Sequence, residues 1–244
     1  MPPVNGQSHA PERLAQFLST LSHDLRGACH GILLSIEMLR RDLANGRSGD
    51  ELREDLDLAR QAVIDASVRL ERLITAERLR SGMMPNRPIE GDLAPALRRA
   101  AEQSAASVPE ATGRLVIDLP TNLRAVVDAR LAGEMIGGLL DHALRQANAE
   151  GSIRVDFDPV AAAVRVLAPA PWLGVSERRL LAGAGELNGF DPPDLGLFVA
   201  GRCAALAGIE LQTDVPAPAG MELVHIRFLA PADQVLTGSP MTAG

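Results

Sequence analysis

The sequence predicts an α+β protein in two parts: a two-helix antiparallel hairpin that dimerises into a four-helix bundle, followed by an α/β sandwich with helices on one face of a mixed sheet. Apolar residues recur at three- and four-residue steps through the first third of the chain. A segment rich in Gly and Pro follows, and after it short strand patterns alternate with helical ones. Aromatic residues make up only 2% of the chain and tyrosine is absent, so Leu, Val, Ile and Ala must build the core, which favours helices packed on a sheet.

Composition and charge exclude several classes of protein. An apolar fraction of 46% is ordinary for a globular chain, so general disorder is excluded. The net charge is −7 and every basic residue in the Lys and Arg count is arginine, which argues against nucleic-acid binding through bulk charge. Cys29 and Cys203 stand far apart without a second Cys or a His pair nearby, so we expect neither a disulfide framework nor a metal site. The first residues do not resemble a leader, and no apolar run approaches the ~20 residues of a membrane span. We therefore expect a soluble cytoplasmic protein that binds neither membrane nor nucleic acid.

Residues 11–81 are predicted to form two long helices separated by a turn at residues 45–50. Each helix carries one stripe of residues at heptad-like spacing. The stripe of the first helix comprises Leu14, Phe17, Leu21, Leu25, Ala28, Ile32, Ile36, Leu39 and Leu43. The stripe of the second helix comprises Leu52, Leu56, Ala59, Val63, Ala66, Leu70, Leu73 and Glu77, and is apolar until its last position. Because a lone hairpin cannot cover both stripes, we expect a homodimer.

A linker at residues 81–88 separates the hairpin from the second part, so the domains are predicted over residues 10–84 and 88–232. In the second part we expect helices over residues 92–107, 128–147 and 194–207, and strands over residues 114–119, 124–127, 152–157, 161–167, 209–213 and 221–229. Asp128 is the expected N-cap of its helix. The last two strands are expected to form a hairpin. Gly196, Gly201 and Gly208 are interpreted as helix packing and capping residues.

His23 does not belong to the apolar stripe of the first helix. It follows Leu21 by two residues and precedes Leu25 by two, so at ~100° per residue it points about 160–200° away from the stripe. This geometry argues against a core histidine and leaves an ordinary exposed histidine as an alternative. The carboxylate of Asp24 can keep one ring nitrogen protonated, which leaves the other as a nucleophile.

The residues that share the face of His23 favour a functional role. They are Arg26, Gly27 and His30, at the third, fourth and seventh positions after it. A glycine inside a helix costs about 1 kcal/mol relative to alanine, and Gly31 adds a second such cost. A helix that accepts these costs beside an exposed imidazole leaves room for another surface to approach.

The segment FLSTLSHDLR, residues 17–26, resembles the H-box of bacterial sensor histidine kinases, usually F-x-x-x-x-S-H-E-L-R-T-P. Residues 70–74 (LERLI) and 79–82 (LRSG) resemble the end of the second helix of the same dimerisation domain. The resemblance implies that residues 10–84 are a dimerisation and phosphoacceptor domain, with His23 as the phosphoacceptor and Asp24 at the acidic position beside it. Ala28 replaces the family's proline. Gly27 replaces the Thr or Asn that positions water for dephosphorylation, which argues against phosphatase activity.

Residues 88–232 resemble the ATP-binding domain of these kinases, with its ligand-binding positions changed. The stretches DARL (128–131) and GLLDHALR (138–145) fall where the family has D-x-x-R-L and N-L-L-x-N-A-x-K. Gly138 and His142 therefore replace the two asparagines that hold magnesium and phosphate in the family. An imidazole is a poor substitute, because Mg²⁺ prefers oxygen ligands in octahedral geometry.

The two glycine-rich motifs of that domain are changed as well. LAPAPWL (167–173) falls at the family's D-x-G-x-G motif, so Ala168 replaces the adenine-reading Asp and Trp172 replaces a glycine that permits close approach. LGLFVAGRCAALAG (195–208) resembles the helix after the nucleotide lid. Asp194 places negative charge where the family holds triphosphate, and of that motif's glycines only Gly196 remains. By resemblance, these changes imply a degenerate domain with little or no ATP binding.

The combination is similar to histidine phosphotransferases of phosphorelays, including the ChpT-like proteins. The resemblance implies that His23 accepts a phosphoryl group from one response-regulator receiver domain and passes it to another, while Asp24 steadies the imidazole and Arg26 neutralises charge. The receivers, which bring Mg²⁺, would dock on the face that carries Arg40 and Arg41. A second copy of the chain and a hybrid histidine kinase are the other implied partners. Two alternatives stay open: an atypical sensor histidine kinase that autophosphorylates His23 from ATP, and a non-catalytic scaffold that binds a response regulator.

Overall fold

The computed structural model describes residues 27, 30–43, 45, 49–108, 113–147, 151–183 and 192–228. The chain divides into two compact units, Met1–Glu77 and Arg78–Gly244. No helix among the described residues is long and apolar enough to cross a membrane.

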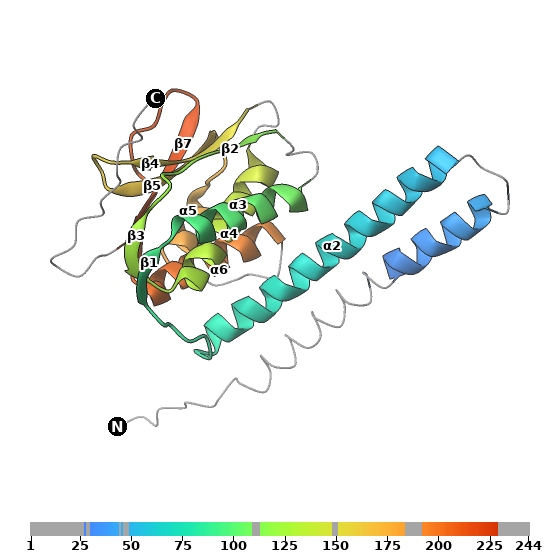
Figure 1. The fold of residues 1–244 in the computed structure, drawn as a ribbon, viewed down its shortest axis with the longest axis horizontal. Coiled ribbons are helices and arrows are strands. Elements are labelled where there is room, and N and C mark those ends of the chain that lie inside the picture. Colours follow the sequence, from blue (N-terminus) through green and yellow to red (C-terminus); the bar gives the residue numbers. More distant parts are fainter. Residues whose placement is uncertain are drawn as a thin grey trace, which may run out of the picture. The chain divides into compact units, whose positions relative to one another are not determined.

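The first unit contains the predicted helical hairpin (Figure 1). Residues 30–43 are helical, the amide of Asn45 donates to the carbonyl of Arg41 at 3.0 Å, and α2 spans Gly49–Arg80. Basic residues Arg78 and Arg80 lie in the last turn of α2, where positive charge complements the helix dipole. The two predicted helices are therefore confirmed over the described residues. Of the predicted turn, Asn45 is in a turn, whereas residues 49 and 50 already belong to α2.

The second unit is an α/β sandwich. Its described helices are α3 (Ala94–Ser107), α4 (Ala129–Gln146), α5 (Val175–Leu181) and α6 (Pro192–Ala207). Its described strands are β1 (Ile89–Asp92), β2 (Leu115–Asp118), β3 (Arg124–Val127), β4 (Ile153–Asp158), β5 (Ala163–Pro169), β6 (Ile209–Gln212) and β7 (Met221–Phe228). β1 and β3 pair antiparallel, and a second sheet has the order β2-β4-β5-β7-β6. In that sheet β2 and β4 are parallel and the other pairs are antiparallel, so the predicted mixed sheet and its final hairpin are confirmed.

The sheet has one apolar face and one charged face. Figure 1 shows α4 and α6 beside the sheet. The side chains of the apolar face are fully buried, and they comprise Ile153, Val155, Val164, Val166, Ala168, Val224 and Ile226. The residues between them point to the other face, which carries charged side chains such as Arg154, Asp156 and Arg165. The fully buried apolar row on this face explains why the helices lie on one side of the sheet, as predicted.

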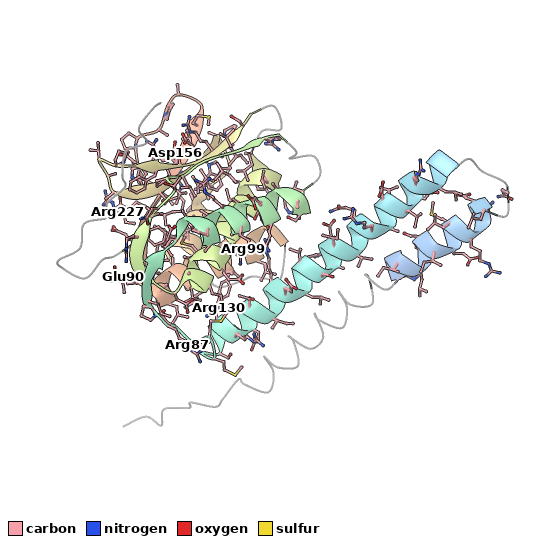
Figure 2. All side chains as sticks on the ribbon, in the orientation of Figure 1. Arg87, Glu90, Arg99, Arg130, Asp156 and Arg227 are labelled. Carbon is pink, nitrogen blue, oxygen red and sulfur yellow. The ribbon has the colours of Figure 1, made fainter. Side chains whose placement is uncertain are left out.

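α4 begins as predicted at Asp128. The Oδ1 atom of Asp128 accepts from the amides of Arg130 and Leu131 at 3.0 and 3.3 Å, which satisfies two free amides of the first turn. Its Oδ2 atom accepts from the amide of Arg87 at 3.0 Å, and Arg130 donates to the carbonyl of Pro85 at 2.8 Å. Figure 2 shows Arg87 and Arg130 close together. The linker therefore forms no helix or strand, as predicted, but part of it is bound to the second unit.

The prediction missed β1 and α5, and two helix starts were wrong. β1 has the sequence IEGD, whose glycine and acidic residues are poor strand formers, and it is a strand because it pairs with β3. Asp92 ends β1 instead of beginning the helix, because its carboxylate accepts from the amides of Ala94 and Leu123. α6 begins at Pro192, two residues early, since proline is favoured in a first helical turn.

Candidate functional site

The predicted phosphoacceptor group lies outside the described residues. This applies to His23, Asp24 and Arg26, whose roles stay predictions. Among the described neighbours, Gly27 is helical and a Cβ added there meets no atom within 4 Å. The same holds for Gly31. Neither glycine is therefore required for close packing against the part of the chain that the structure describes.

Exposed apolar side chains continue along the face that the sequence predicts for His23. Leu34 is 53% exposed and Met38 is 55% exposed. At ~100° per residue, both lie within about 60° of the direction predicted for His23. Arg40 and Arg41, in the next turn, are exposed as well. Exposed apolar groups beside basic ones are typical of a protein-binding surface.

A different apolar row lies on the opposite side of the helix of residues 30–43. Ile36 and Leu43 belong to it, and both are more than half exposed in the single chain. On α2 the corresponding stripe exposes Leu56 and Val63. A row of large exposed apolar side chains along two neighbouring helices is the pattern of helices that associate with a further helical surface.

Gly138 lies where α4 crosses α6. A Cβ added at Gly138 would lie 3.1 Å from the carbonyl carbon of Gly196 and 3.3 Å from the Cβ of Ala200, and closer still to the carbonyl oxygen of Gly196. Only a residue without a side chain fits there. In the same way Gly201 brings α6 against the carbonyls of Leu180 and Leu181, and Gly208 ends α6 with a φ of 70°. The interpretation of Gly201 and Gly208 as packing and capping residues is confirmed, and that of Gly196 stays a prediction.

His142 and Trp172 are in contact in the interior of the second unit. Each is 3% exposed. The Nε2 atom of His142 lies 2.8 Å from the carbonyl oxygen of Trp172, and the centres of the two rings are 6.2 Å apart at an angle of 45°. The imidazole is thus directed at a main-chain oxygen of its own chain.

The segment that carries Trp172 is also bound by Glu222, a residue the sequence analysis missed. The Oε2 atom of Glu222 accepts from the amides of Trp172 and Leu173 at 2.8 and 2.9 Å, and its Oε1 atom accepts from Arg178 at 3.2 Å. The available signal was the pattern of the strand at residues 221–229. Glu222 stands at an inward position in line with Val224 and Ile226, and a charged residue in an apolar row indicates a buried partner.

The structure describes most of the positions that the resemblance assigns to nucleotide binding. Gly138 has no side chain, and Ala168 is fully buried without a polar side-chain atom. The Nε2 atom of His142 is in contact with the carbonyl oxygen of Trp172. The side chain of Asp194 lies outside the described part of the chain, and Gly196 contributes its main chain to the α4–α6 contact. No group of three or more His, Cys, Asp or Glu within the described ranges could hold a metal ion.

An ionic network covers part of the outer face of the sheet, away from these positions. Asp156 accepts from Arg165 through both carboxylate oxygens, at 2.6 and 3.0 Å, and also pairs with Arg154 at 3.0 Å. These hydrogen bonds raise the pKa of Arg165. The amide of Ala161 lowers the pKa of Asp158, which also pairs with Arg165. Figure 2 shows Asp156 on the sheet, where the network ties adjacent strands together.

Comparison with known proteins finds a similarity for the first part of the chain. Residues 13–82 match the family model described as "His Kinase A (phospho-acceptor) domain", a range that includes His23. A comparison with curated proteins finds no significant match.

Solved structures match over most of the chain. Full-length ShkA in complex with AMPPNP is 19% identical with a TM-score of 0.51, and the match covers 88% of this chain and 46% of that one. The histidine kinase AdeS of Acinetobacter baumannii is 16% identical with a TM-score of 0.48, over 84% of this chain and 95% of that one. A structure described as a bacterial phosphotransferase is 13% identical with a TM-score of 0.48, and the match covers 89% of this chain and 97% of that one.

The predicted fold class is confirmed: a helical hairpin precedes a sheet-containing ATPase-like domain, as in histidine kinase structures. Together with the match of residues 13–82, this gives the chain a histidine kinase-like architecture of the kind found in two-component signalling. The fold alone does not distinguish a kinase from a phosphotransferase.

Proposed function

We propose that the chain is a histidine phosphotransferase that relays phosphoryl groups between response-regulator receiver domains through His23, with little or no ATP binding. The match of residues 13–82 to a phosphoacceptor family model supports the choice of His23. The preference for a phosphotransferase over a kinase rests on the contacts made by the residues at the positions that bind nucleotide in the resembled kinases. Trp172 lies in the interior against His142, and Gly138 touches the main chain of α6.

In the proposed reaction the free ring nitrogen of His23 attacks the phosphorus of an aspartyl phosphate on the first receiver. An N–P bond forms, the P–O bond to the aspartate breaks, and the aspartate leaves with the electron pair of that bond. Asp24 stabilises the imidazole while it is cationic, and Arg26 offsets negative charge on the group in transit. Transfer to the second receiver reverses these steps, with an aspartate of that receiver as the nucleophile. The Mg²⁺ that assists this chemistry comes with the receivers.

The docking surface proposed for the receiver is the face of the first helix that continues from His23. Leu34 and Met38 supply exposed apolar area, and Arg40 and Arg41 supply positive charge for an acidic partner. The opposite apolar row, with Ile36 and Leu43, is proposed to lie in the seam of a homodimer. These two surfaces lie on different sides of the helix, so a dimer leaves the docking surface accessible.

The proposal is tested by a relay reaction in vitro. The purified chain is incubated with a receiver domain phosphorylated on aspartate with a radioactive label, and a second, unlabelled receiver is then added. We expect label on the chain and afterwards on the second receiver, and we expect His23→Ala to abolish both. His30→Ala is the matched control, because His30 is exposed one helical repeat further along the same face. Relay that persists in the His23→Ala variant, or a wild-type chain that takes up no label from the receiver, would refute the proposal.

The alternative function is an atypical sensor histidine kinase, which the histidine kinase-like fold favours. It predicts that the purified chain takes up label from ATP labelled on its γ-phosphate, at His23. The relay proposal predicts no uptake above the level of the His23→Ala variant. A scaffold without catalysis predicts that His23→Ala leaves signalling intact in the cell.

A further inference from the structure

One segment of the second unit is bound from two sides through its main chain. Residues 170–174 connect β5 to α5. On one side the amides of Trp172 and Leu173 donate to the same carboxylate oxygen of Glu222, at 2.8 and 2.9 Å. On the other side Nε2 of His142, in α4, lies 2.8 Å from the carbonyl oxygen of Trp172. Three consecutive polar groups of this segment are therefore satisfied by side chains of other elements.

The carboxylate of Glu222 also connects this segment to α5. Its second oxygen accepts from Nη2 of Arg178 at 3.2 Å, and Nη1 of Arg178 donates to the carbonyl of Thr213 at 2.9 Å and pairs with Asp214 at 3.1 Å. Glu222 and Arg178 are both partly shielded from solvent. Hydrogen bonds to a charged group in such surroundings are stronger than those between neutral groups. Glu222 thus joins β7, the segment of residues 170–174 and α5.

The position of the Trp172 ring depends on this main-chain arrangement. The ring is almost fully buried, and its Nε1 atom donates to the carbonyl of Glu222 at 3.4 Å. A large side chain can be held in place by the apolar groups around it, or by hydrogen bonds that fix the main chain of its own residue. Here the amide, the carbonyl and the ring nitrogen of one residue are all bound, which fixes the backbone independently of the ring's apolar contacts.

We propose that Glu222 and Arg178 form a latch that holds Trp172 in the interior and fixes the conformation of the segment of residues 170–174. In this latch Glu222 is the central residue, because it binds both amides and the guanidinium. The inference goes beyond the proposed relay: it concerns what orders the ATPase-like domain and uses no residue of the first unit.

Trp172 is the only tryptophan of the chain, so its fluorescence reports on the latch directly. We expect acrylamide to quench the wild-type protein weakly. In the Glu222→Ala and Glu222→Gln variants we expect stronger quenching, and hydrogen exchange at the amides of Trp172 and Leu173 about tenfold faster or more. Glu210→Ala is the matched control, since Glu210 is an exposed glutamate on the neighbouring strand β6, and it should leave both readouts unchanged.

Each outcome decides the proposal. If both Glu222 variants keep the far-UV circular dichroism, the quenching and the exchange rates of the wild type, the latch does not exist. An equal change in the Glu210 control also overturns it, because the effect is then general. If Glu222→Ala does not fold, Glu222→Gln and Arg178→Ala decide by the same two readouts. The measurement involves neither receiver nor nucleotide, so a result that overturns the latch leaves the relay proposal unaffected, and the reverse also holds.

Discussion

Replacing Gly138 with alanine should destabilise the second unit, although alanine is the better helix former. In a helix interior, alanine is favoured over glycine by about 1 kcal/mol. At Gly138, however, the new Cβ would lie 3.1 Å from the carbonyl carbon of Gly196 and 3.3 Å from the Cβ of Ala200, both shorter than ordinary van der Waals contacts. α6 would have to move away from α4, and the contacts around the crossing would lengthen.

The magnitude follows from these opposing contributions. Overpacking of a well-packed interior costs about 1–3 kcal/mol, and this site lies at the upper end because the atoms that must move are main-chain atoms of a helix. After subtracting the gain in helix propensity, we expect Gly138→Ala to lower the free energy of unfolding by about 1–2 kcal/mol. With a urea dependence of about 2 kcal/mol per molar, the midpoint should fall by about 0.5–1 M. Gly138→Asn, which restores the asparagine of the resembled motif, places a larger side chain at the same contact and should lower it further.

The assay is urea unfolding followed by the fluorescence of Trp172, which reports on the unit that contains the change. Gly133→Ala is the matched control in the same helix. Its new Cβ would meet only Ala96 and Ala100, both at 4.0 Å, so this variant should be up to about 1 kcal/mol more stable than the wild type. The reasoning is refuted if the two variants change stability in the same direction, because the close contact with α6 is then not what excludes a side chain.

Three further predictions use other parts of the chain. Asp156→Asn should lower the free energy of unfolding by about 1–2 kcal/mol, since it weakens the bidentate bond to a partly exposed Arg165, and urea unfolding measures it. Burial raises the pKa of Cys203 to about 12, so the native thiol keeps a proton that the unfolded thiol loses above about pH 9. Stability should therefore fall between about pH 9 and 12, by up to ~1.4 kcal/mol per pH unit relative to Cys203→Ala, in urea titrations at each pH. Gly31→Ala should raise the thermal midpoint of the hairpin, because among the described residues no atom outside the surrounding turns of the helix lies within 4 Å of the new Cβ. The same variant should slow phosphotransfer if a partner approaches this face.

The elements that the sequence predicts well are those with long periodic patterns or a local cap. α2 and α4 were predicted within a few residues because each has a regular apolar stripe, and Asp128 was identified as the N-cap of α4 because that interaction spans only three residues. β1 was missed because its strand character comes from pairing with β3, more than 30 residues away.

The sequence was sufficient to predict which residue types stand at the candidate site. It was not sufficient to predict which residues they contact. A glycine at position 138 and a tryptophan at position 172 indicated changed ligand positions, whereas their new partners depend on tertiary structure. Glu222 meets the segment at Trp172 because β5 and β7 pair in the register that places Ala168 opposite Glu222. That register joins residues more than 50 positions apart, and a pattern within one strand cannot specify it.

Several residues that differ from the resembled nucleotide-binding motifs contact one another or share partners within the chain. His142 faces the carbonyl of Trp172, the amide of Trp172 binds Glu222, and Gly138 allows α6 to lie directly against α4. Residues that share partners in this way do not contribute additively to stability. Restoring one residue of the resembled motif would therefore break an existing contact without completing a binding site, because the other positions would still be filled. We accordingly expect each single restoration, such as His142→Asn or Trp172→Gly, to reduce the stability of the second unit without producing measurable ATP binding. Equilibrium dialysis with labelled ATP, together with urea unfolding followed by circular dichroism, checks both parts, and ATP binding gained by either single variant would show that these positions act independently.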